Sequence, residues 1–80
     1  MAKTKTLVDL SPGESATILR LAGEASDNQR LMHMGIIDGV SVEFVRQAPS
    51  GDPIEITVMD YALSLRRDDA ARIIIEEPTD

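Results

Sequence analysis

The sequence predicts a mainly β protein, a small barrel of about five short strands with one short α-helix after the first core strand. Apolar and polar residues alternate with a period of two in several short segments, which is the pattern of half-buried strands. Single glycines and prolines separate these segments. The chain has only 80 residues, so we expect a single domain over residues 1–80, without a deep cleft.

The first half of the chain supplies one strand and the helix. Residues 11–14, Ser-Pro-Gly-Glu, are typical of a type II turn and precede a mostly apolar segment, residues 16–21, which we interpret as the first core strand. Residues 26–29 have the Ser-x-x-Gln spacing of a capping box, which predicts a helix beginning at Ser26. Gly35 fits the left-handed residue that commonly follows a helix, so the helix should end just before it.

The second half supplies the remaining strands. Alternation and a final isoleucine run predict strands at residues 40–44, 54–59, 61–65 and 72–76. A connection with two prolines and a glycine, residues 48–53, joins the first two of these as a hairpin. Residues 66–71 have the composition of a single helical turn. Residues 1–6 and 77–80 are polar, and we expect loose tails there.

The predicted core consists of apolar residues on the inward faces of these elements. It contains Ile18, Leu21, Leu31, Met34, Val40, Val42, Phe44, Ile54, Ile56, Val58, Leu63, Leu65 and Ile74.

Composition excludes several classes of function. The 14 acidic and 8 basic side chains give a net charge of −6, which disfavours a nucleic-acid partner because phosphate binding needs clustered Lys and Arg. The absence of cysteine excludes disulfides, Cys-ligated zinc and thiol nucleophiles. No apolar run approaches the length that spans a bilayer, and no signal segment is visible, so we expect a cytoplasmic protein that is not inserted in the membrane.

Catalytic and metal-binding patterns are also missing, so we expect neither an enzyme nor a cofactor. His33 is the single histidine, no Gly-x-Ser-x-Gly motif occurs, and the glycines are scattered singly rather than grouped in a phosphate loop. His33 lies between two methionines that could bind a soft metal ion, but consecutive helical residues point about 100° apart and do not converge. Asp68 and Asp69 are placed at the start of a helical turn, where their charge suits the helix dipole.

Several side chains are candidates for partner binding. The candidate partner-binding residues are Arg30, Met32, His33, Met59, Tyr61, Arg66 and Arg67. Methionine is favoured at adaptable binding surfaces, and Met59 alternates outward from its strand. Arg66 and Arg67 allow two interpretations. They form a docking patch for an acidic partner or for anionic lipid, or they belong to a solvated face and are balanced by the aspartates that follow them.

The order and spacing of several motifs resemble the FeoA family of bacterial ferrous-iron-transport accessory proteins, over residues 10–76. The motifs are Leu-Ser-Pro-Gly-Glu (10–14), Arg-Leu-Met-His-Met-Gly-Ile (30–36), Asp-Gly (38–39), Ala-Pro (48–49), Gly-Asp-Pro (51–53) and Leu-Ser-Leu-Arg (63–66), with Ala70 and Ile73. Two positions depart from the family: Asp60 stands where glycine is frequent, and Met34 where leucine is common.

The resemblance implies an SH3-like barrel and a cytosolic accessory protein. Its expected partner is the cytosolic part of FeoB, a membrane ferrous-iron transporter with a GTPase domain. Weak self-association is a second expectation. The same domain occurs at the C-terminus of iron- or manganese-dependent repressors of the diphtheria-toxin-repressor type. A free-standing metal-responsive or regulatory SH3-like domain is therefore the alternative.

Overall fold

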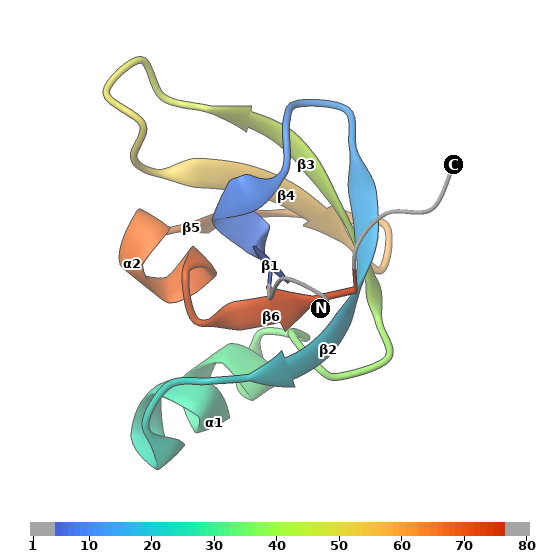
Figure 1. Cartoon of the computed structure of the whole chain (residues 1–80), viewed down its shortest axis with the longest axis vertical. Helices are drawn as coiled ribbons and strands as arrows, with labels where there is room; N and C mark the ends of the chain where they lie inside the picture. Colours follow the sequence, from blue (N-terminus) through green and yellow to red (C-terminus); the bar gives the residue numbers. More distant parts are fainter. Residues whose placement is uncertain (1–4, 77–80) are drawn as a thin grey trace.

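The computed structural model describes residues 5–76, which form a small barrel (Figure 1). Its elements in chain order are β1 (Lys5–Thr6), the 3-10 helix η1 (Leu7–Asp9), β2 (Ser15–Leu21), α1 (Ala25–His33), β3 (Ser41–Gln47), β4 (Ile54–Val58), β5 (Tyr61–Leu65), α2 (Arg67–Ala70) and β6 (Ile73–Ile75). In Figure 1, β3 and β4 lie above, β1 and β6 lie below them, and α1 lies at the lower end. The mainly β class and the short helix after the first core strand are as predicted.

One antiparallel sheet, in the order β1-β6-β2-β3-β4-β5, curves into the barrel. The first part of β2 pairs with β3 and its second part pairs with β6, with a register irregularity between Ile18 and Arg20. A second irregularity lies in β3, between Phe44 and Arg46. Such irregularities bend a strand, which lets a single sheet fold back over its own core.

The predicted core is largely confirmed. Its buried members are Ile18, Leu31, Val42, Phe44, Ile54, Ile56, Val58, Leu65 and Ile74. The others, which are half-buried and pack against these, are Leu21, Met34, Val40 and Leu63. The buried residues that the sequence analysis missed are Leu7, Leu10, Ala16, Ile36, Ala70, Ile73 and Ile75. Most of them lie in η1, in α2, in connections or in β6, where an alternating pattern is not expected.

The start of α1 differs from the prediction. The helix begins at Ala25, so Ser26 lies inside its first turn, and no side chain caps the helix start. The Asn28 side chain instead holds the preceding loop, accepting a 3.0 Å hydrogen bond from the Gly23 amide and donating one of 3.0 Å to the Gly23 carbonyl. At the other end Gly35 follows the helix with φ of +94°, as predicted.

The chain between residues 5 and 14 is more ordered than the sequence analysis predicted. Lys5 and Thr6 form β1, opposite Ile75 and Ile74 of β6, where we expected a loose tail. The remaining predicted tail residues, 1–4 and 77–80, lie outside the described residues. The type II turn is confirmed, because the Glu14 amide donates to the carbonyl of residue 11 across 3.0 Å and Gly13 has φ of +91°.

Candidate partner-binding surface

A tight turn between β4 and β5 presents two of the predicted binding residues. Met59 and Asp60 have φ of +48° and +69°, and Val58 lies opposite Tyr61. Two left-handed residues in a two-residue hairpin loop make a type I′ turn, which favours Asn and Gly. Methionine in the left-handed region is uncommon and strained. The turn leaves the Met59 side chain 54% exposed, in agreement with its predicted outward position.

The same turn meets the end of α1. The Tyr61 hydroxyl donates a hydrogen bond to the carbonyl of Met34, the residue directly after α1. Gly35 lies directly beneath this contact: a Cβ atom there would collide with the Tyr61 hydroxyl and lie 3.4 Å from Met59 Cε. Glycine is therefore required at position 35 for two reasons: the backbone has a positive φ, and the Tyr61 hydroxyl occupies the space that a Cβ atom would take.

These contacts bring Met59 and Tyr61 to the end of α1, whose last turn contains Met32 and His33. We call Met32, His33, Met59 and Tyr61 the helix-end patch. Met32 is 48% exposed and Tyr61 is 42% exposed, while His33 is also exposed. Met32 and His33 form the last turn of α1, directly before the Met34 carbonyl that Tyr61 binds. Exposed, partly apolar side chains on a rigid helix end and a tight turn are suited to binding a protein surface.

Arg30 belongs to a different group of side chains. Its guanidinium donates a 2.8 Å hydrogen bond to Asp69 Oδ1, and Arg72 lies 3.2 Å from Asp27 and 3.6 Å from Asp69. The hydrogen bond to Asp69, followed by the negative charge of that carboxylate, raises the pKa of Arg30 above its ordinary value. Asp69 is only 7% exposed, so it is a structural carboxylate that joins α2 to α1 rather than part of a solvated face.

Arg66 and Arg67 lie at the opposite end of β5 from Tyr61. Both side chains are exposed, and neither forms an ion pair within residues 5–76. The Arg67 backbone amide donates a 3.0 Å hydrogen bond to Asp52 Oδ1, which ties the start of α2 to the β3–β4 connection. The predicted set therefore divides into the helix-end patch, the structural Arg30 and this basic pair.

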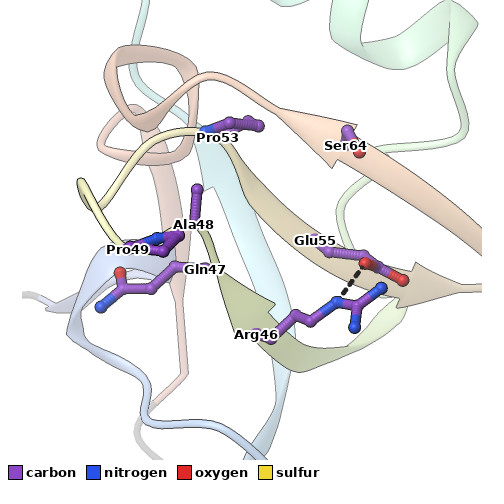
Figure 2. Close-up of a pocket in the computed structure, with 7 residues that line it drawn as sticks. All are labelled: Arg46, Gln47, Ala48, Pro49, Pro53, Glu55 and Ser64. Atoms are coloured by element: carbon purple, nitrogen blue, oxygen red, sulfur yellow. Dashed lines mark hydrogen bonds and ion pairs between the residues drawn. The ribbon is translucent and has the colours of Figure 1, made fainter.

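Two hollows are lined by residues from several strands of the described chain. One, of about 360 Å³, is lined by Ser15, Val40, Ser41, Val42, Glu43, Thr57, Met59 and Asp60, so it adjoins the helix-end patch. Figure 2 shows the other, of about 320 Å³, which is lined by Arg46, Gln47, Ala48, Pro49, Pro53, Glu55 and Ser64. Arg46 Nε lies 2.8 Å from Glu55 Oε1 along its floor. The sequence analysis missed both hollows, because they combine residues from several strands.

Neither hollow contains a recognisable catalytic or metal-binding group of side chains. Within residues 5–76, no cluster of three or more His, Asp or Glu side chains could hold a metal ion. Over the same residues, no helix is long and apolar enough to cross a membrane.

Comparison with known proteins agrees with the predicted resemblance. The FeoA domain model matches residues 5–77. The Fe(2+) transport protein A/Fe(2+) transporter FeoB fusion protein of Porphyromonas gingivalis is 40% identical over 70 residues, which are 88% of this chain and 8% of that protein. The chain thus spans a small part of the fusion protein's length.

Solved structures show the same fold. The FeoA-like protein from Clostridium acetobutylicum superposes with a TM-score of 0.88 at 29% identity, covering 100% of this chain and 93% of that one. The zinc complex of Stenotrophomonas maltophilia FeoA, a procaryotic SH3 domain protein, superposes with a TM-score of 0.78 at 26% identity, covering 94% and 91%. The predicted SH3-like barrel is confirmed.

Proposed function

Because the chain belongs to the FeoA family, we propose that it is a binding module that docks on the cytosolic part of a FeoB-type ferrous-iron transporter. FeoA domains are non-catalytic accessory domains of ferrous-iron transport, in keeping with the lack of catalytic motifs in this sequence. The observation that carries the proposal is the Porphyromonas gingivalis relative, which joins a FeoA domain and a FeoB transporter in one polypeptide. A covalent link raises the effective concentration of two domains, which benefits domains that bind one another.

The helix-end patch is the surface that we assign to this contact. It combines exposed methionines with a tyrosine whose hydroxyl is already held by the Met34 carbonyl. A side chain that is fixed before binding loses little conformational freedom when the partner arrives. The adjoining hollow, with Met59 on its border, gives a partner side chain a place to enter.

An NMR titration tests the proposal. The ¹⁵N-labelled chain is titrated with the cytosolic region of the FeoB-type transporter from the same organism. We expect chemical-shift changes centred on Met32, His33, Met59 and Tyr61. An unchanged spectrum at a saturating concentration of that region would rule out the proposed function.

A matched pair of variants tests the assigned surface. Met59→Asn removes an exposed apolar side chain and is compatible with the fold, because asparagine suits the left-handed turn better than methionine does. We expect it to weaken binding about tenfold, the effect of losing about 1.4 kcal/mol. Leu19→Asn is the control, since Leu19 is similarly exposed but lies on β2. If the two variants bind the transporter region with equal affinity, the contact does not involve the helix-end patch.

A further inference from the structure

The two edges of the sheet differ in how they are protected. One edge is β1, which has only two residues and includes Lys5. The other is β5, whose pairing with β4 runs without a bulge from Val58–Tyr61 to Ile54–Leu65. β5 contains no proline and no charged residue. Short length, lysine, proline and bulges are the features that keep edge strands from pairing with another chain, and β5 has none of them.

The register of the β4–β5 hairpin identifies the backbone groups that face outward. In a two-residue hairpin, the residues that close the turn form a hydrogen-bonded pair, here Val58 and Tyr61. Hydrogen-bonded and non-hydrogen-bonded pairs then alternate, so Leu63 and Leu65 also bond to β4. The N–H and C=O groups of Ala62 and Ser64 consequently point away from the sheet, and both residues are exposed.

This edge is complementary to itself. We propose that two copies of this chain pair through antiparallel β5 strands, with Ala62 of each opposite Ser64 of the other. In that register the two Leu63 residues meet on the twofold axis. Each copy contributes the outward groups of both Ala62 and Ser64, so the two strands can exchange four backbone hydrogen bonds.

Side chains favour this register over others. It brings Asp60, the turn residue just before β5 of one copy, close to Arg66, the residue just after β5 of the other. Both side chains are exposed, and neither forms an ion pair within the described part of the chain. Arg66 has extended backbone angles, φ −69° and ψ 146°, so the strand direction continues up to it. Leu63 is half-buried in one copy and gains apolar contact across the axis.

The dimer should be weak. A stable protein interface usually buries at least about 1,200 Å² of surface, and a single pair of short strands buries less than that. We therefore expect a dissociation constant of about 0.1–0.5 mM. Sedimentation equilibrium of the full chain from about 0.01 mM to about 1 mM covers this range. A chain that remains monomeric at about 1 mM would overturn the inference.

Charge reversal tests the register. Asp60→Arg alone places two arginines opposite each other, and Arg66→Asp alone places two aspartates opposite each other, so each variant should dimerise at least about tenfold more weakly. An equimolar mixture of the two variants should associate again. In the mixed dimer, the introduced arginine of one variant faces the introduced aspartate of the other, and the second contact is a native Asp60–Arg66 pair. Aspartate is also a favourable residue at the start of α2, so Arg66→Asp should fold. A mixture that associates no better than the separate variants would refute the register.

A backbone variant tests the edge itself. Ser64→Pro removes an outward N–H without removing a bond to β4, and proline is tolerated at such edge positions. It should abolish dimerisation, while Ser64→Ala should not. If Ser64→Pro does not fold, the mixture of charge variants still decides the question. A monomeric chain whose Ala62 and Ser64 amides become protected from exchange only when the transporter region is added would assign the edge to that partner and overturn the inference.

Discussion

Replacing Gly35 by alanine tests the link between the end of α1 and the β4–β5 turn. A side chain at φ of +94° costs about 1–2 kcal/mol, because Cβ crowds the following carbonyl. The new Cβ must also displace the Tyr61 hydroxyl, which loses its bond to the Met34 carbonyl at a cost of about 0.5–1.5 kcal/mol. We therefore expect Gly35→Ala to lower the free energy of unfolding by about 1.5–3.5 kcal/mol.

Gly39→Ala is a matched control that measures only the cost of placing a side chain at a positive φ. Gly39 has φ of +91°, but a Cβ atom there would meet nothing within 4 Å. Its replacement should cost only about 1–2 kcal/mol. Urea denaturation of both variants gives the difference directly, and each kcal/mol should lower the melting temperature by about 4–8 °C.

Tyr61→Phe identifies the source of that difference. Without the hydroxyl, the nearest ring atom is Cζ of residue 61, which lies 3.5 Å from the position that an alanine Cβ would take, an ordinary contact. In the Tyr61→Phe background, Gly35→Ala should therefore cost no more than Gly39→Ala. If Gly35→Ala costs the same as Gly39→Ala in the native background too, the contact between Tyr61 and the helix end contributes nothing, and the reasoning is wrong.

Three further predictions concern the core, the charge network and metal binding. Phe44→Ala should cost about 3–5 kcal/mol in urea denaturation, because Phe44 is 2% exposed, and a loss below about 1 kcal/mol would show that it is not a core residue. Asp69→Asn should lower the melting temperature by about 4–8 °C, because it leaves Arg30 and Arg72 without their shared buried carboxylate; an unchanged melting temperature would contradict the structural role of Asp69. The hydrogen bond to Asp69 raises the pKa of Arg30, so the arginine's contribution to stability is present below its ordinary pKa and is lost as the pH rises through the raised pKa. Micromolar Fe²⁺ should leave the melting temperature of the native chain and of His33→Ala unchanged, whereas an increase abolished by His33→Ala would support a metal-responsive domain.

Alternation in the sequence was sufficient to predict the strands that have one buried face. In β4, residues Ile54, Ile56 and Val58 are buried and the residues between them are half-buried, as the period of two requires. β6 does not alternate, because Ile73, Ile74 and Ile75 are all buried, and the isoleucine run rather than alternation predicted this strand. Alternation could not identify β1, because a strand of two residues has no period, and its partner β6 lies at the other end of the described chain.

The candidate surface was predictable by residue type but not by arrangement. Alternation predicted an exposed Met59 by extending the strand to it, but Met59 is exposed because it lies in the turn that follows β4. The exposed Met32 follows from its place on the helix. The contact of Tyr61 with the Met34 carbonyl joins segments that no local pattern relates. The buried Asp69 carboxylate is paired with Arg30, which lies in a distant part of the sequence. From the sequence alone, Asp69 could therefore be interpreted only locally, as part of a helix start.

The position of β6 has a consequence for how the chain folds. It is the last strand of the described sequence, yet it lies between β1 and β2 and pairs with both. During synthesis, the ribosome must release residues 73–75 before either ladder can form, and until then β1 has no partner and β2 has only β3. Pairings between such distant segments also place the chain among slowly folding β topologies, with refolding times of milliseconds to seconds. A protein truncated before Ile73 would lose both ladders at once, so the barrel is expected to form late and cooperatively rather than strand by strand.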